Sequence, residues 1–446
     1  MKRRSFLASA EGAAFAAVPV PAHHSGAGTP ASAKPAPIRT LAGKSLRDLR
    51  EEYRHWLFED YLPFVDKYVI DHELGGFMCT TDRDGANITT EKRSGYAGRG
   101  VWVYSHLYRT LDRNPEHLEV ARKTVEFLLR GRPADGSLWP PSFTREGKPL
   151  GDTPKSVNTD LYIAEGIAEY ARAAKDESYR LLARDILFTC LRIYDTPGYL
   201  ADAGKSFLGP DGPDTNGVTL LDDWMLFLRL ATQMLEHAPD PEIETLSKRC
   251  TDTITNNFHN PDFGLLNEML TQDLAHPPND ISQLVTFGNI FQVLWHTLFE
   301  AVRTKNRALF ETTAERLHLH IEVAWDDVYG GVFGTLKHVD NNIWETAKIN
   351  YVHTECLIGL LMIIEYTGHE WAQEWFSRIY TYTLEKFPLK KHGFPLWNVS
   401  ADRKMTFVTH ANRVENYHHP RHLMLNMECL DRIIRRGGKV SGVFER

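Results

Sequence analysis

The chain has 446 residues, of which 42% are hydrophobic and 24% are charged, and this composition excludes both a disordered chain and a protein built of membrane spans. The net charge of -7 is modest for this length and no basic stripe is present, so a nucleic-acid partner is not expected. The five cysteines are scattered without a Cys-x-x-Cys pair, which argues against a zinc cluster or a dithiol redox site.

The first residues predict an export signal. Residues 2–7 (KRRSFL) place paired arginines before a weakly apolar, Ala-rich run that ends near Ala22. This order is typical of a twin-arginine signal, although the basic start of a disordered tail would look similar. Glu11 and the short length of the run exclude a spanning helix. We predict a signal peptide over residues 1–22 and a periplasmic or secreted protein with no membrane contact after its removal.

Helical periodicity dominates the rest of the chain. Residues 23–40 are rich in Pro, Ala, Ser and Gly and predict a linker without a core. From residue 41 onward, apolar and aromatic residues return every three to four positions in paired segments. The predicted helices lie near residues 44–64, 96–113, 117–130, 158–175, 178–194, 219–236, 241–257, 284–304, 307–322, 344–367, 369–386 and 416–435.

The order of these helices predicts an all-α toroid. Long loops rich in Gly, Pro and Asp separate the pairs, at residues 131–157, 198–218, 258–283 and 388–415. Helical hairpins without strand–helix alternation argue for a closed ring of six hairpins and against a doubly wound sheet. Loops at one rim of such a ring would form a funnel-shaped cleft. The aromatic and polar loop at residues 139–143 (WPPSF) suits a wall for a carbohydrate.

Two polar clusters near the C-terminus suit proton transfer. Residues 415–421 (ENYHHPR) contain an acid, two imidazoles, a phenol and a guanidinium. Histidine titrates near neutral pH, and arginine can hold sugar hydroxyls or a carboxylate. Alone, this segment fits a polar loop at the start of the last helix. A second cluster at residues 348–355 (KINYVHTE), ahead of an apolar helix, favours a site for a hydroxylated substrate.

Several motifs lie in a characteristic order along nearly the whole mature chain. They are residues 75–77 (GGF), 98–102 (GRGVW), 159–162 (TDLY), 165–166 (EG), 267–268 (NE), 348–355 and 417–421 (YHHPR). Residues 348–355 resemble a K-x-W-W-P-H-x-E segment, and residues 417–421 resemble an F-H-x-P-R segment, of the N-acylglucosamine 2-epimerase superfamily. The resemblance implies an (α/α)6 barrel over residues 41–446, as a single catalytic domain that epimerises or isomerises sugars.

The resemblance implies roles for particular side chains. Arg99 and Glu355 would position the substrate, and His418 would transfer the proton. Other residues expected to bind substrate are Trp102, Glu268, Asn289, Gln292, Lys348, Tyr351, His353, Tyr417 and Arg421. Arg99 is equally suited to a buried ion pair with Glu355. Trp102 is more suited to the core than to stacking on a sugar, as are Tyr162 and Trp344.

The sequence departs from the family in one segment. The family carries a second catalytic histidine in a P-G-H-x-x-E segment, where this chain has residues 287–292 (FGNIFQ). Asn289 and Gln292 therefore replace both ionisable groups. An amide cannot accept a proton at pH 7, so Asn289 cannot serve as a general base. His296 lies about 10 Å farther along the helix and is a poor substitute.

This departure favours one kind of reaction. Epimerisation at C2 by two bases is impaired, whereas aldose–ketose isomerisation moves a proton between C1 and C2 on one face and needs a single base. His418 would be that base, with Arg99 and Lys348 stabilising the enediolate and Glu355 orienting hydroxyls. This chemistry needs no metal and no ligand spacing demands one, so no cofactor is expected.

Other functions remain compatible with the sequence. The main alternative is a lyase that cleaves a uronate polysaccharide by β-elimination, with groups drawn from Arg99, Asn289, Gln292, His353, Tyr417 and His418. Export from the cytoplasm favours it. Hydrolysis would need paired carboxylates, for which the candidates are Asp222, Asp223, Glu268 and Glu355. A non-catalytic sugar-binding protein is the last alternative. In each case the partner is a mono- or oligosaccharide, and a homodimer is an allowed assembly.

Overall fold

The structure is a computed structural model that describes residues 35–199, 217–389, 394–395, 398–399, 412–414 and 416–445, apart from the single positions 83, 153, 155 and 279. The predicted signal peptide lies outside the described residues, as do most of the predicted linker and Glu415. Ala36–Arg446 form one compact unit. No helix in the described part of the chain is both long and apolar enough to cross a membrane.

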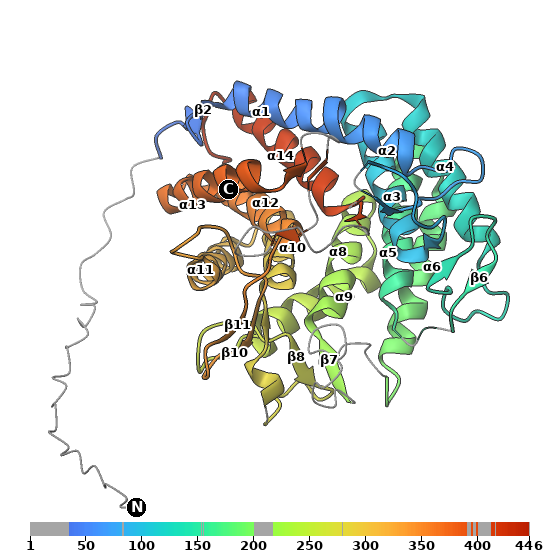
Figure 1. The fold of residues 1–446 in the computed structure, drawn as a ribbon. Coiled ribbons are helices and arrows are strands. Elements are labelled where there is room, and N and C mark those ends of the chain that lie inside the picture. The colour runs from blue at the N-terminus through green and yellow to red at the C-terminus, as the bar shows by residue number, and fades with distance from the viewer. Residues whose placement is uncertain are drawn as a thin grey trace, which may run out of the picture. The chain divides into compact units, whose positions relative to one another are not determined.

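The helices of this unit form an inner and an outer ring (Figure 1). The inner helices, each packed against the next, are α3 (Ser94–Leu107), α5 (Asn158–Ala174), α8 (Leu221–His237), α10 (Phe287–Arg303), α12 (Asn350–Thr367) and α14 (His418–Arg435). Their outer partners, in the same order, are α4 (Pro115–Arg130), α6 (Glu177–Tyr194), α9 (Pro241–Asp252), α11 (Arg307–Ala324), α13 (Glu370–Lys386) and α1 (Leu46–His55). The predicted all-α (α/α)6 barrel is confirmed.

The sequence explains which helices lie inside. The inner helix α12 is buried along most of its length, and its segment 356–364 (CLIGLLMII) is apolar on every face. The outer helix α11 buries only one stripe, including Phe310, Ala314, Leu317 and Ile321. An inner helix contacts neighbours on all sides, whereas an outer helix keeps one polar face toward solvent.

Two glycines allow α3 and α5 to approach closely. A Cβ atom on Gly98 would lie 2.6 Å from the backbone oxygen of Tyr162, and a Cβ atom on Gly166 would overlap the backbone oxygen of Gly98. Any larger residue would force the two backbones apart. This crossing fixes the position of Arg99, which follows Gly98 in α3.

The first and last helices close the ring. α1 continues through the π-helical turn η1 (Trp56–Tyr61) into α2 (Leu62–Tyr68), and α1 packs on α14. Arg50 Nε lies 3.1 Å from Asp431, and the amide of Asn426 donates to the hydroxyl of Tyr53 at 3.1 Å. Two similar π-helical turns, η2 (Tyr108–Asp112) and η3 (Thr253–Asn257), extend α3 and α9.

Short strands gather at the rim formed by the N-termini of the inner helices. Four of them directly precede an inner helix: β4 (Lys92–Arg93), β7 (Val218–Leu220), β9 (Val285–Thr286) and β12 (Lys348–Ile349). Their antiparallel partners are β5 (Ser142–Phe143), β8 (Met269–Thr271), β10 (Thr335–His338) and β15 (Asn398–Val399). These pairings hold the loops of this rim over the axis of the barrel.

The remaining short elements complete the loops. They are β1 (Thr40–Leu41), β2 (Lys44–Ser45), β3 (Thr80–Thr81), β6 (Pro149–Leu150), β11 (Ile343–Glu345), β13 (Pro388–Leu389), β14 (Phe394–Pro395), β16 (Asn412–Arg413) and the 3-10 turn η4 (Asp280–Gln283). The predicted helix at 344–367 was wrong at its start, because residues 343–349 are extended and pair with β10 and β15. The helix begins at Asn350.

Candidate active site

A cleft of about 470 Å³ opens at the rim where the inner helices begin. Arg99 of α3, Asn158 and Tyr162 of α5 and Asp222 of α8 line it. Pro141 and Ser142, from the predicted carbohydrate-binding loop, also lie in its wall. Its volume is in the range of small-molecule sites.

Arg99 is held at this cleft by aromatic faces. Its guanidinium lies 3.8 Å from the ring centre of Tyr162 and 5.4 Å from that of Tyr417. These cation–π contacts orient the positive charge while Arg99 stays only half-buried. The alternative role of Arg99, as the buried partner of Glu355, is taken by another arginine, Arg421.

Glu355 is the centre of a buried cluster. One carboxylate oxygen lies 2.8 Å from Nδ1 of His418 and 2.6 Å from the guanidinium of Arg421, and the other accepts from the indole of Trp295 at 2.6 Å. Burial alone would raise the pKa of Glu355, but the charge of Arg421 and the hydrogen bond from His418 outweigh it and lower that pKa to about 2. Glu355 is therefore ionised at neutral pH.

This cluster fixes the tautomer of His418. Because the ionised Glu355 can only accept hydrogen bonds, Nδ1 of His418 carries the proton of that bond. Nε2 is then the nitrogen that can accept a proton. His418 is the first residue of α14, and its ring centre lies 5.0 Å from that of Tyr351. A histidine oriented by a carboxylate in this way is suited to general-base catalysis.

A second polar network supports the floor of the site. The hydroxyl of Tyr417 donates to both oxygens of Glu165 at 2.8 Å, and Arg229 donates to the same carboxylate. The guanidinium of Arg421 lies 4.1 Å from the ring centre of Tyr417. Tyr417 and Arg421 are fully buried and hold His418 and Glu355 in position, and their contact with the substrate stays a prediction.

The two amides of α10 lie in the same cluster. The amide nitrogen of Asn289 donates to Glu268 at 2.9 Å, and the amide oxygen of Gln292 accepts from Arg421 at 2.7 Å. Burial raises the pKa of Glu268 well above its usual value. The amide at 292 carries no charge, and the charge of Arg421 is balanced mainly by Glu355.

Comparisons with known proteins agree with this geometry. No family model matches the chain. The N-acylglucosamine 2-epimerase of Bos taurus is 24% identical over 428 residues, which cover 92% of this chain and 96% of the bovine protein. The chain is thus similar to an N-acylglucosamine 2-epimerase over nearly its whole length.

Solved structures agree with the superfamily fold. The cellobiose 2-epimerase of Bacillus thermoamylovorans B4167 has a TM-score of 0.74 at 17% identity and covers 86% of this chain and 99% of its own. A D-mannose isomerase has a TM-score of 0.71 at 13% identity, with 87% and 97% covered. At these identities the likeness establishes the fold, and the chemistry must be argued from the side chains.

Two residues of the superfamily-like segment at 348–355 have structural roles, which corrects their assignment to substrate binding. Lys348 is fully buried and donates to Asp326 and to the backbone oxygen of Gly330, both at 2.5 Å. His353 accepts from the backbone of Val332 at 2.9 Å. Both side chains thus hold the turn that follows α11, and neither lines the cleft.

A repeat of this turn elsewhere in the barrel supports that correction. Lys92, which precedes α3 as Lys348 precedes α12, donates to the backbone oxygen of Gly75 at 2.6 Å and lies 2.9 Å from Asp71. His320 likewise accepts from the backbone of Leu266 at 3.0 Å. Lys92 and Lys348 make the same contacts at equivalent turns, and a histidine accepts from the backbone of a turn in two places, so these contacts belong to the architecture.

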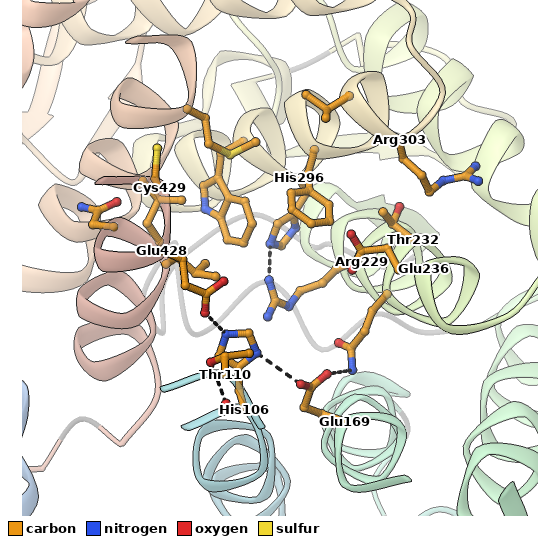
Figure 2. Close-up of a pocket in the computed structure, with 18 of the residues that line it drawn as sticks. His106, Thr110, Glu169, Arg229, Thr232, Glu236, His296, Arg303, Glu428 and Cys429 are labelled. Carbon is orange, nitrogen blue, oxygen red and sulfur yellow. Dashed lines mark hydrogen bonds and ion pairs between the residues drawn. The ribbon is translucent and has the colours of Figure 1, made fainter. Parts of the chain in front are cut away.

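Trp102 faces a different cavity. Its indole donates to Gln233 at 3.2 Å and stacks on His106, with ring centres 4.6 Å apart. Both line a cavity of about 380 Å³ on the barrel axis, formed by the C-terminal halves of the inner helices (Figure 2). Trp102 therefore does not bind substrate at the rim, and its expected role in the core is the better description.

The charged groups of this axial cavity are paired with each other. His106 lies between Glu169, at 3.2 Å, and Glu428, at 2.6 Å (Figure 2). Burial would lower the pKa of His106, but the two carboxylates outweigh it and raise that pKa. Arg109 lies 2.7 Å from Glu169. Positive charges at the C-termini of helices interact favourably with the helix dipoles, so we assign this network to the stability of the barrel.

The carboxyl pair considered for hydrolysis is divided between two environments. Asp222 is half-buried and lines the cleft, whereas the neighbouring Asp223 is fully buried. They do not face each other across a substrate site.

Several residues at the site were missed from the sequence. Asn158, Glu165, Arg229 and Trp295 were not singled out for these roles. The available signal was their place on the inner helices, where site residues recur at i, i+3 or i, i+4. Asn289 with Gln292, and His418 with Arg421, follow that spacing.

Proposed function

We propose that this protein is a sugar isomerase that converts an aldose into a ketose by moving a proton between C2 and C1. The observation that carries the proposal is the hydrogen bond from His418 Nδ1 to Glu355, which leaves Nε2 as the nitrogen that accepts a proton. The ring of His418 contacts that of Tyr417, which in turn contacts Arg99 of the rim cleft. The proposal is supported by relatives named as epimerases of N-acylglucosamine and by a structural neighbour named as a mannose isomerase.

His418 performs the carbon chemistry in this account. Its Nε2 removes the C2 proton of the open-chain aldose, and the electrons of that bond form the C1–C2 double bond of an enediolate. The imidazolium that results is stabilised by the charge of Glu355 across Nδ1. A proton then passes from O2 to O1, the C2–O2 double bond forms, and C1 takes the proton of His418 on the same face, which gives the ketose and restores neutral His418.

Arg99 stabilises the charge that develops on the sugar oxygens. Its guanidinium is held in the cleft wall by Tyr162, so it is oriented before the substrate enters. Lys348 cannot share this role, because Asp326 and the backbone of Gly330 already hold it. The enediolate is thus stabilised by one fixed cation and by hydrogen-bond donors of the rim.

Asn289 favours isomerisation over epimerisation at C2. The resemblance to the superfamily gives this position to a second catalytic histidine, and an amide bonded to Glu268 cannot replace it as a base. One base on one face suffices for C1–C2 transfer. Epimerisation would need the enediolate to turn over or a donor on its other face.

We further propose that the enzyme is exported. Residues 2–7 resemble a twin-arginine signal, and removal of residues 1–22 would give a mature protein that works outside the cytoplasm on a free mono- or oligosaccharide. The distribution of the full-length chain between cytoplasm and periplasm, compared with that of an Arg3→Lys, Arg4→Lys variant, tests this. An unchanged distribution contradicts it.

Proton NMR in D₂O with aldohexoses, amino sugars and uronate oligosaccharides tests the proposed reaction. We expect a ketose to form from at least one aldose. A C2 epimer as the main product would show that the protein is an epimerase and would contradict the isomerase proposal. Loss of the C5 proton of a uronate with a new vinylic signal would establish the lyase alternative, and absence of any reaction would contradict an enzyme of either kind.

A further inference from the structure

The rim cleft carries an acid that none of the steps above uses. Asp222 lies in the first turn of α8 and lines the cleft with Arg99 and Tyr162. The amide of Asn158, from the first turn of α5, donates to Asp222 Oδ2 at 2.8 Å. This hydrogen bond holds the half-buried carboxyl group of Asp222 in one orientation at the wall of the cleft.

The surroundings of Asp222 separate it from the other acids nearby. The groups that act on it electrostatically are Arg99 of α3, Tyr162 of α5, Asp223 of α8, Glu268 ahead of β8 and Tyr351 of α12. Glu91 and Arg93 lie at the outer edge of the cleft. Burial raises the pKa of Asp222 to about 6, against the opposing charge of Arg99.

The neighbouring acids are not available for proton transfer in the same way. Asp223 and Glu268 are fully buried, and burial raises both of their pKa values well above the usual range. Burial likewise raises the pKa of the Tyr351 phenol. Asp222 alone among these acids combines access to the cleft with a pKa near the working range of a general acid or base.

We propose that Asp222 is a second catalytic residue, which carries protons between the two oxygens of the sugar while His418 carries the proton between the two carbons. This inference rests on the proposed isomerase function. Asp222 gives the chain a second proton-transfer group, on α8. Position 289 on α10 holds an amide, which cannot take that role.

The two steps balance in protons and electrons. In the first, His418 removes the C2 proton, the C1–C2 double bond forms, and O1 takes the proton of the neutral Asp222 carboxyl, which gives an enediol. In the second, the Asp222 carboxylate removes the O2 proton, the C2–O2 double bond forms, and C1 takes the proton of the His418 imidazolium. Both side chains return to their starting states.

Asp222→Asn tests this role, because the introduced amide can still donate a hydrogen bond to O1 but cannot move a proton. In D₂O, enediolate that reverts gives aldose with deuterium at C2, whereas completed turnover gives ketose. We expect ketose formation to fall by about 10²-fold or more and C2 exchange to fall by less than about 10-fold. A structural role would lower both rates together.

Asp223→Asn is the matched control, since it makes the same change one residue away in a side chain that does not line the cleft. Both rates should remain near those of the wild type. Circular dichroism and thermal melting verify that each variant is folded.

The pH profile gives a second readout. Because the first step needs neutral Asp222, wild-type kcat/KM should fall as pH rises through about 6, and Asp222→Asn should lack this limb. Equal loss of exchange and isomerisation, or an unchanged profile, would overturn the role of Asp222 while leaving the isomerase intact. A wild-type protein that converts no aldose would overturn both.

Discussion

Glu355 determines the protonation states at this site. It is fully buried, yet it has a hydrogen-bond donor on each oxygen and the guanidinium of Arg421 beside it. A buried charge is tolerated only when it is paired in this way. The same carboxylate sets the tautomer of His418. Both the proton-accepting form of His418 and the stability of the buried cluster therefore depend on Glu355.

Glu355→Gln should lower the free energy of unfolding at pH 7 by about 3–5 kcal/mol, because it leaves Arg421 as an uncompensated buried charge. The lowered pKa of Glu355 predicts the pH dependence. Its contribution is complete above the unfolded pKa near 4.5 and is lost as pH falls toward about 2, so wild type and variant should converge over that range.

Urea denaturation at several pH values measures this convergence. Glu119→Gln is the control, because its partner Arg122 is exposed and the pair should contribute less than about 1 kcal/mol. A gap between wild type and Glu355→Gln that is independent of pH would contradict the assigned charge state.

At the scale of the elements, the turn that precedes α3 and the turn that precedes α12 are built alike. Lys92 with Asp71 and Lys348 with Asp326 are buried ion pairs at equivalent places. We expect Lys348→Met to lower stability by about 3–5 kcal/mol, since it removes the lysine that pairs with the buried Asp326. Lys92→Met should lower stability by less, since Arg145 still pairs with Asp71 at 2.8 Å. Thermal melting and kinetics of the folded fraction measure this. A raised KM for Lys348→Met with unchanged stability would show that Lys348 binds the substrate.

The crossing of α3 and α5 gives a second prediction for an element. Gly98→Ala should destabilise the protein by several kcal/mol, because the added Cβ meets the backbone of Tyr162 at 2.6 Å. Gly95→Ala, one turn earlier in α3, meets no atom closer than 3.8 Å and should be neutral or slightly stabilising. If Gly98→Ala and Gly95→Ala changed the free energy of unfolding equally in chemical denaturation, the close approach of α3 and α5 would not limit their packing.

The sequence predicted the elements better than their contacts. Periodicity is local, so the helix pairs and the helices that carry His418 and Glu355 near their N-termini could be predicted. The partners of Glu355 could not, because Trp295 and Arg421 come from other helices, and neither could the burial of Lys348. Asp222 was considered only for hydrolysis, since nothing local shows that it shares a cleft with Arg99.

At the scale of the whole molecule, the ring is completed by its two ends. α1 packs on α14, and the backbone of Ile38 donates to Gly438 at 2.8 Å. Such contacts join residues far apart in sequence, so a prediction based on neighbouring hairpins cannot supply them. Because α14 begins with His418, the N-terminal helix also supports the helix that carries the base.

Leu49→Ala in α1 should therefore lower the free energy of unfolding by about 2–5 kcal/mol, as for a residue in the middle of a core. Leu181→Ala in α6 is the control, since its side chain is 53% exposed and its change should stay within about 0.5 kcal/mol. A negligible effect of Leu49→Ala in urea denaturation would mean that α1 is not part of the closed ring.

The loss of the C2 proton from an accepted aldose in D₂O, compared between wild type, His418→Asn and His419→Leu, tests the central claim most directly. His419 is the matched neighbour, buried against Tyr61 and His422 and away from Glu355. We predict that His418→Asn lowers the exchange rate by about 10²–10⁴-fold while folded His419→Leu stays near wild type. Exchange that survives in His418→Asn would contradict the account.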